Sequence, residues 1–238
     1  MRITILTLFP EQFEGFITTS IIKKAILKEL VTVELVNIRD YTTDKHNRVD
    51  DYPYGGGAGL VMKCQPIMDA LEAVVTPDSY VVYLGPAGKT LTQPKVKQLV
   101  NDVEHLVLLC GHYEGIDERI LSRVHETISI GDYVLSGGEV AAMVVSDAII
   151  RLVDGVITPE STLEESFENH LLEYPQYTMP RVYEGMAVPE VLLSGHHENI
   201  RLFRLKEALR KTKEIRPDLL EKKKLTKEEK KLLDEIDL

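Results

Sequence analysis

The chain lacks several residues and patterns that define common protein classes. It holds no tryptophan and only two cysteines among 238 residues. Because Cys64 and Cys110 lie far apart and outside any CxxC motif, the sequence excludes a disulfide scaffold and predicts two reduced, buried thiols. No apolar run approaches the ~18 residues that a membrane span requires, and the first residues show no signal-peptide pattern. We therefore expect a cytoplasmic protein with no membrane segment.

Several nucleotide- and metal-binding motifs are also missing. The segment Gly85–Thr90 ends in Gly-Lys-Thr, but two residues separate its glycines where a P-loop needs four to wrap a phosphate. No GxGxxG motif occurs, so the usual sign of a Rossmann cofactor site is absent. His112-Tyr113-Glu114 is similar to the HxE of zinc deaminases, yet the chain has no PCxxC partner for it. No cluster with metal-ligand spacing stands out, and we expect no bound metal.

The composition that remains is globular, with an uneven distribution of charge. Hydrophobic residues make up 44% and charged residues 28% of the chain, as in ordinary folded domains. The net charge is −10, yet residues 201–231 hold 13 basic and six acidic side chains. A basic segment on an acidic body suits contact with a polyanion, because phosphate binding responds to the local field. The pattern fits a solvated helix face with i,i+4 pairs equally well.

The first 155 residues alternate strand-like and helix-like segments. Apolar runs and strict alternation predict strands over 3–8, 31–37, 80–84 and 105–110. Amphipathic spacing predicts helices over 21–30, 66–75, 93–100 and 138–153, the first capped by Ser20 and the second opened by Pro66. Strands separated by helices favour parallel pairing through crossovers. We therefore predict an α/β domain with a parallel sheet.

The pattern changes after about residue 155. Residues 161–174 are polar and acidic, which indicates a linker or a short helix. From Asn199 onward, apolar residues recur on one helical face until Arg216-Pro217 interrupts the helix. Thr226 and Glu229 have the spacing of a capping box and predict a final helix. This part of the chain is expected to be a helical domain.

Three loop segments carry the strongest sign of a ligand site. Residues 49–59 include four glycines in five positions, so the backbone there can approach a ligand closely. Residues 111–119 and 130–139 each follow a predicted strand, and we expect them at neighbouring strand ends. Ligands of open α/β sheets bind beyond the carboxyl ends of strands. One such loop is explained by flexibility alone, whereas three together favour a bound small molecule.

These loops belong to a set of motifs that resembles one enzyme family over essentially the whole chain. The motifs are Leu6–Pro10, Val49–Gly59, Gly111–Arg119, Ile130–Glu139, Glu173–Thr178 and Val188–Gly195. In this order they are similar to the bacterial tRNA (guanine-N1)-methyltransferases of the SPOUT superfamily, which modify guanosine 37 next to the anticodon. The resemblance implies an α/β fold whose SPOUT-type parallel sheet contains a deep trefoil knot, followed by a small helical C-terminal domain.

The resemblance also implies a division of labour along the chain. It places a knotted methyltransferase domain in residues 1–160, an interdomain linker in 161–172 and a helical tRNA-binding domain in 173–238. It implies a homodimer with the active site at the subunit interface, and tRNA as the macromolecular partner.

S-adenosylmethionine is the cofactor that the resemblance implies, held in a bent form by the knot loops. The residues carried over by motif are Tyr83, Leu84, Pro86, Gly111, Tyr113, Glu114, Gly115, Ile130, Gly131, Asp132, Tyr133, Val134, Leu135, Gly137 and Gly138. Backbone groups of the glycine-rich loops would read the adenine edge, with Ile130 and Leu135 on its faces. Glu114 is expected near the sulfonium cation, which its carboxylate attracts.

The implied reaction needs removal of the N1 proton of guanine while negative charge develops at O6. The family's arginine on the helix after the knot matches Arg151. The family's base is the aspartate of an Asp-Ser-Phe motif, and this chain reads Glu164-Glu165-Ser166-Phe167. Glu165 therefore takes the position of the base with one extra methylene, and Glu164 is the competing carboxylate.

The implied tRNA contacts are Asp50, Arg204, Arg210 and Lys211. The chain departs from the family's Tyr-Thr-Arg-Pro motif by reading Tyr-Thr-Met-Pro-Arg over 177–181, so either Arg181 replaces the missing charge or the chain makes one phosphate contact fewer. Two alternatives stay open. One is a non-catalytic RNA-binding protein that keeps the knot for dimerisation, and the other is a SPOUT methyltransferase that acts at another RNA position.

Overall fold

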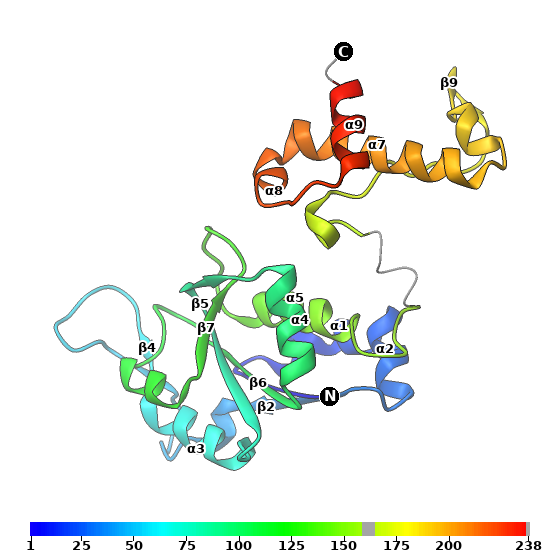
Figure 1. The fold of residues 1–238 in the computed structure, drawn as a ribbon. Helices are drawn as coiled ribbons and strands as arrows, with labels where there is room; N and C mark the ends of the chain where they lie inside the picture. The colour runs from blue at the N-terminus through cyan, green and yellow to red at the C-terminus, as the bar shows by residue number, and fades with distance from the viewer. Residues whose placement is uncertain (159–164, 237–238) are drawn as a thin grey trace. The chain divides into compact units, whose positions relative to one another are not determined.

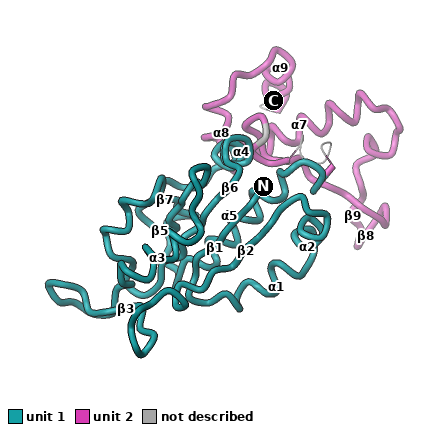
Figure 2. The backbone as a smooth tube through the Cα atoms, turned by 90° about the horizontal axis from the view of Figure 1, so that it is seen from below, with its two compact units in different colours: residues 1–157 teal, residues 158–238 magenta. Residues whose placement is uncertain are grey.

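The computed structural model describes residues 1–158 and 165–236. The chain divides into two compact units, Met1–Ile157 (unit 1) and Thr158–Leu238 (unit 2), shown in teal and magenta in Figure 2. Each unit has its own hydrophobic core. The change of pattern that the sequence shows after about residue 155 falls at the boundary between these units.

A five-stranded parallel sheet forms the centre of unit 1, as the alternation of strands and helices predicts (Figure 1). Its strands in spatial order are β2 (Thr32–Asn37), β1 (Arg2–Thr7), β6 (His105–Cys110), β5 (Ser79–Thr90) and β7 (Glu126–Ser129). All four pairings are parallel. The central strand β6 is buried along its whole length, because both faces of the sheet are covered.

Helices pack on both faces of the sheet (Figure 1). The first core contains α2 (Ser20–Leu27), α4 (Gln93–Asp102) and α5 (Glu139–Ile150), and the second contains η2 (Ile38–Tyr41), α3 (Cys64–Val74) and η3 (Glu118–Arg123). Alternate residues of β6 serve the two cores: Leu106 and Leu108 join the first, Val107 and Leu109 the second. The smaller elements are η1 (Pro10–Phe13), α1 (Glu14–Ile17) and a hairpin of β3 (Asp50–Asp51) with β4 (Val61–Met62).

Three local expectations are wrong in detail. β5 continues to Thr90, so the segment that is similar to a P-loop lies within this strand, which shifts register after Leu84 and pairs with β7 again at Lys89 and Thr90. Ser20 is the first residue of α2, and the N-cap is Thr19. β5 lies between β6 and β7, so the loops after those two strands do not follow neighbouring strands. Periodicity finds strands but carries no information on their spatial order.

Unit 2 is built around three helices, α7 (His197–Ile215), α8 (Pro217–Glu221) and α9 (Lys227–Ile236). Short elements precede them: η4 (Glu168–His170), a hairpin of β8 (Val182–Tyr183) with β9 (Met186–Ala187), and η5 (Glu190–Leu193). Leu209 of α7 and Leu232 of α9 are buried together in the core of this unit.

The helix boundaries of unit 2 follow the sequence signals closely. The break at Arg216-Pro217 is confirmed, since α8 starts at Pro217. The capping box is also confirmed: the Thr226 N–H donates to Glu229 Oε2 at 2.7 Å, and the Glu229 N–H donates to Thr226 Oγ1 at 3.2 Å. Part of the expected linker, residues 159–164, lies outside the described residues.

Candidate functional site

A cavity of about 460 Å³ opens where the loops after β6 and β7 meet the distal half of β5. It is lined by Tyr83, Leu84, Gly85, Pro86 and Ala87 of β5, by residues 111–116, by Glu118 and Leu121, by Thr127–Gly131, by Tyr133–Gly138 and by Ala141. Every residue that the sequence predicts to contact the cofactor is in this lining except Asp132. The structure therefore brings together fourteen of the fifteen in one hollow.

Backbone contacts fix the shape of the loop after β6. Tyr113 has φ +59° and Gly115 has φ +129°, and the Gly115 N–H donates to His112 O at 3.1 Å to close a tight turn. The Glu114 N–H donates to Leu60 O at 3.0 Å, and the Met62 N–H donates to Gly115 O at 2.9 Å. Segment 60–62 therefore braces this wall of the cavity from outside.

The glycine-rich loop 49–59 does not line the cavity, although the sequence groups it with the other two loops. Tyr52 and Tyr54 are exposed. Its one approach to the cavity wall is at Gly59, where an added Cβ would collide with the Glu114 side chain. Of the three loops that suggest a ligand, two form this hollow and the third supports it.

Two glycines at the base of the cavity let the loops after β6 and β7 approach each other closely. A Cβ on Gly138 would lie 2.7 Å from Cys110 Cα and 3.0 Å from Gly111 N. A Cβ on Gly111 would lie 2.9 Å from the Tyr83 hydroxyl. Gly138 also donates its N–H to Gly111 O at 2.8 Å, so the two loops touch backbone to backbone. Burial, followed by the nearby charge of Glu118, raises the pKa of Tyr83, which favours its neutral hydroxyl beside Gly111.

The rim of the cavity and the helix that follows it expose apolar side chains. Val134 is 93% exposed, and Tyr133 and Leu135 are exposed beside it. On α5, Val140 and Val144 face solvent while Val145 and Ile149 are buried in the core. Because a helix that is apolar on all sides is normally buried, this surface has the character of an interface.

Arg151 is the C-cap of α5 and lies far from the cavity in the same chain. The helix begins next to the cavity, and twelve residues at ~1.5 Å each separate the ends by roughly 18 Å. Val140, Val144, Asp147 and Arg151 recur at helical spacing and so share one side of α5. The predicted arginine thus stands at the far end of the exposed apolar stripe.

Glu165 belongs to unit 2, where it lines a cavity of about 370 Å³. Other residues of that cavity include Tyr174, His197, Arg201 and Arg204. The Arg204 guanidinium stacks over the Tyr174 ring at 4.8 Å from its centroid. The competing carboxylate Glu164 lies outside the described residues.

The residues predicted to contact tRNA lie in unit 2, except Asp50, which lies in the β3–β4 hairpin of unit 1. Arg210 Nη1 forms an ion pair with Glu207 Oε1 at 2.9 Å, and Lys211 Nζ donates to Glu173 O at 3.1 Å. Asp50 is half-buried in β3, opposite Met62 of β4. Arg210 and Lys211 are therefore partly neutralised or tethered inside the chain.

Five other cations lie at the surface between α8 and the middle of α9. They are Lys222, Lys224, Lys227, Lys230 and Lys231, all exposed, and we call them the α9 lysines. None of them forms a salt bridge with a described residue, although the charges of Lys222 and Lys231 help to lower the pKa of Asp218 and of Glu235. By contrast, Arg201 and Lys206 of α7 pair with Glu228 and Glu235 of α9 at 2.7 and 2.9 Å. The α9 lysines are five of the thirteen basic side chains of segment 201–231.

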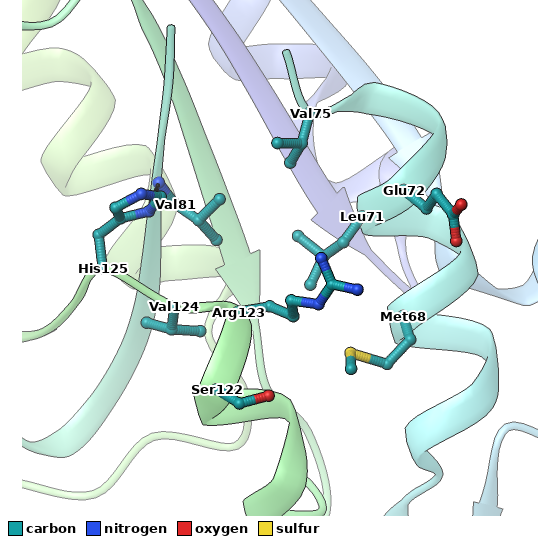
Figure 3. A pocket seen from close by; sticks show the side chains of 9 residues that line it. All are labelled: Met68, Leu71, Glu72, Val75, Val81, Ser122, Arg123, Val124 and His125. Carbon is teal, nitrogen blue, oxygen red and sulfur yellow. Dashed lines mark hydrogen bonds between the residues drawn. The ribbon is translucent and has the colours of Figure 1, made fainter. Parts of the chain in front are cut away.

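A second cavity in unit 1, of about 430 Å³, contains none of the predicted site residues (Figure 3). Met68, Leu71 and Glu72 of α3 form one side, and Arg123 points toward them from the other. His125 Nδ1 accepts the Val81 N–H at 2.9 Å, so its ring is already held by the sheet. This hollow has no convergent set of polar groups.

Sequence reasoning missed two side chains at the main cavity. His112 lines it, and Glu139 is 3% exposed behind Gly137 and Gly138. Their positions in the sequence could have indicated them, because His112 falls inside the motif 111–119 and Glu139 inside the motif 130–139. Among the residues described, no group of three or more His, Cys, Asp or Glu side chains gathers as a metal site would require. No helix in the described ranges has the length and apolarity of a membrane span.

Comparison with known proteins identifies relatives over the full length. Residues 1–222 match the family model described as tRNA (Guanine-1)-methyltransferase TrmD. The chain is 57% identical to a tRNA (guanine-N(1)-)-methyltransferase of Clostridium botulinum (strain Kyoto / Type A2), covering 98% of this chain and 97% of the relative. It is 55% identical to proteins of the same name from Dictyoglomus turgidum and Caldanaerobacter subterraneus, covering 99% of this chain and 96% and 98% of those relatives.

Proposed function

The chain belongs to the tRNA (guanine-1)-methyltransferase family, and we propose that it transfers a methyl group from S-adenosylmethionine to N1 of guanosine 37 in tRNA. The observation that carries this proposal is the cavity beyond β5, β6 and β7, where fourteen of the fifteen expected cofactor residues converge. The family match supplies the substrate class, and the position in tRNA comes from the resemblance of the motifs.

The residues of the cavity fit the proposed methyl donor. Gly111, Gly137 and Gly138 let the two loops pack closely at the base of the cavity, because a Cβ at each would collide with neighbouring protein atoms. Leu135, Ile130 and Tyr133 offer apolar area for its faces. The Glu114 carboxylate in the same lining attracts a positively charged sulfonium. When bound, S-adenosylmethionine supplies an electrophilic methyl group.

The chain contributes the proton chemistry in this proposal. Glu165 accepts the N1 proton of guanine as general base, which frees the N1 lone pair for the new bond to carbon. Arg151 stabilises the negative charge that moves toward O6. The carboxylate keeps the charge of the family's aspartate, and its extra methylene changes the reach and the rotamer of the side chain.

A homodimer is part of the same proposal. The exposed stripe of Val140 and Val144 supports an interface on α5, and Arg151 stands roughly 18 Å along the helix from the cavity of its own chain. A second copy related by a two-fold axis brings a new Arg151 near each cavity without any change of fold. We propose that the deep trefoil knot of the family holds the loops around the cofactor.

Unit 2 is proposed to hold the tRNA. Arg204, Arg210 and Lys211 remain the proposed contacts from α7, and Asp50 from unit 1. The α9 lysines add a surface whose charges are available for phosphates. They lie largely beyond residue 222, where the family match ends.

Two measurements test the proposed function. Isothermal titration with S-adenosylmethionine should show binding, whereas a non-catalytic RNA-binding protein would give no heat. Mass spectrometry of tRNA treated with the protein and the methyl donor should show one added methyl on guanosine 37. Methylation at another nucleotide would support the other SPOUT alternative and contradict the assignment of position.

A mixed dimer tests the two-chain site. Arg151→Ala and Gly111→Val are each expected to be inactive alone. When the two variants are co-expressed, the heterodimer contains one site with an intact cavity and an intact partner arginine, so activity should return. Val144→Lys, which places a charge on the apolar stripe, should give monomers by analytical ultracentrifugation. No recovery in the mixture would assign Arg151 to its own chain.

A further inference from the structure

Glu139 is a buried carboxylate that the proposed reaction does not use. It is the first residue of α5 and is 3% exposed. The other buried carboxylate among the described residues, Glu229, is explained by its capping box and by Lys223 at 3.2 Å. A buried charge is costly unless it is paired, so the surroundings of Glu139 require an explanation.

The two oxygens of Glu139 face different parts of the fold. Oε1 accepts the Thr7 hydroxyl at 2.8 Å, and Thr7 Oγ1 in turn accepts the Phe9 N–H at 3.0 Å, which ties the carboxylate to the end of β1. Oε2 lies 3.8 Å from His112 Nδ1, an ion-pair distance when the imidazole carries a proton. The N-terminus of α5 also favours negative charge at this position.

His112 connects this carboxylate to the cavity wall. Its Nδ1 is buried without a hydrogen-bond partner in the described part of the chain, so Glu139 is the charged group that it faces. Phe9 packs on the ring at 4.9 Å between centroids. The His112 backbone pairs with Gly137, and its carbonyl accepts the Gly115 N–H. A Cβ on Gly137 would collide with both Glu139 Oε2 and His112 Nδ1, so the three groups are packed together.

We infer that Glu139 is a positioning residue that acts through His112 and holds loop 111–115 against loop 136–138 in the arrangement that receives the methyl donor. This inference rests on the proposed function, because it assigns the donor to this cavity. Glu139 touches neither the donor nor the guanine. Its carboxylate ties the end of β1, the His112 ring and the start of α5 at one buried point.

The first test is Glu139→Gln, which keeps the size and the Thr7 contact but removes the charge. The dissociation constant for S-adenosylmethionine should rise by ~tenfold or more, because the Thr7 hydroxyl then donates to an uncharged oxygen and the carboxylate that faces His112 is gone. The affinity for tRNA should stay unchanged. Glu126→Gln is the matched control, since the Glu126 side chain interacts with Lys95 and Tyr80 and does not line the cavity, and this variant should bind the donor normally.

Hydrogen exchange gives a readout that needs no methyl donor. In Glu139→Gln the Gly138 and Gly115 amides, which donate to Gly111 O and His112 O, should exchange faster, while amides of β6 keep their protection. A fall in protection across the whole sheet would mean that Glu139 only stabilises the fold, and would overturn the inference.

A double-mutant cycle tests the route through His112. His112→Phe keeps a ring against Phe9 but removes the nitrogen that faces Glu139. The effects of His112→Phe and Glu139→Gln on donor affinity should be non-additive, because both variants break the same interaction. Additive effects, or an unchanged affinity in Glu139→Gln while the wild type binds the donor, would overturn the inference. A wild type that binds no donor would instead contradict the proposed function.

Discussion

A buried carboxylate beside the proposed donor cavity of unit 1 contrasts with the surface ion pairs of unit 2. Glu139 in unit 1 is 3% exposed, accepts a hydrogen bond from Thr7 and faces His112. In unit 2, most ion pairs lie at the surface, as between Arg201 and Glu228 at 2.7 Å. A buried charge constrains the backbone around it, whereas an exposed pair contributes only ~0–1 kcal/mol and leaves the fold almost unchanged when it is removed.

This difference separates two kinds of binding surface. A small donor must fit between backbone segments, so its proposed site depends on glycines and on a rigid sheet. Binding of a polyanion requires positive charge at the protein surface but little shape complementarity. The affinity of its proposed site therefore depends on the number of lysines that form no salt bridge. We therefore expect a single substitution at the cavity of unit 1 to cause a large loss of donor affinity. On the surface of unit 2, we expect each substitution to cause a small loss of tRNA affinity, and several such losses to add.

We expect the largest effect from substitution of Glu165. This residue is an exception to the comparison of the two units, because it lies in unit 2 and yet has a proposed role in the reaction. Glu165→Gln keeps the size of the side chain but does not accept the proton as a carboxylate does. The single-turnover methylation rate should fall by ~10²–10⁴-fold, the usual contribution of a positioned base. Donor affinity, measured by titration, should stay unchanged.

Two controls accompany this experiment. Glu165→Asp restores the residue that the family carries and should remain active. Glu164→Gln removes the neighbouring carboxylate and should leave the rate near normal. A normal rate in the Glu165→Gln variant together with a loss in Glu164→Gln would assign the base to Glu164.

Substitution of Gly138 tests whether a single change at the cavity of unit 1 causes a large loss of donor affinity. In Gly138→Ala the new methyl would sit 2.7 Å from Cys110 Cα, and overpacking of this kind costs ~1–3 kcal/mol of folding free energy. Donor affinity and melting temperature should both fall. Gly111→Val should abolish donor binding while the dimer persists. Gly15→Ala is the matched control, since nothing lies within 4 Å of a Cβ there, and retained affinity in both cavity variants would remove these glycines from the site.

Much of unit 1 could be predicted from the sequence, for identifiable reasons. Continuous apolar runs mark the strands, and β6 matches the predicted 105–110 because it is buried on both sides. Local rules also found the capping box of Thr226 and Glu229, whose partners are three residues apart. Such features depend on neighbours in the sequence.

What could not be predicted depends on residues that are distant along the chain. The order of β5 between β6 and β7 is decided by packing, so the loop relationship inferred from the sequence was wrong. The pairing of Thr7 with Glu139 joins positions 132 residues apart. Sequence periodicity does not predict such a contact. The motif match identified the residues of the cavity but did not explain why they are arranged as they are.

We expect the smallest effect from substitution of the α9 lysines, because each substitution removes one surface charge of unit 2. They also allow two groups of cations in unit 2 to be compared for their contribution to tRNA affinity. Replacing Lys224, Lys227 and Lys231 with Ala should weaken tRNA binding and reduce the slope of log affinity against log salt by ~0.7–0.9 for each phosphate that is no longer neutralised. The matched triple Arg204, Arg210 and Lys211 to Ala removes the same charge, but Arg210 is already paired with the Glu207 carboxylate and Lys211 is tethered to the backbone carbonyl of Glu173. Its effect on the salt slope should therefore be smaller, while donor affinity stays unchanged in both. Filter binding at a series of salt concentrations decides the order. An unchanged slope in the lysine triple would show that the α9 lysines are a solvated face, and that the cations of α7 carry the contact with tRNA.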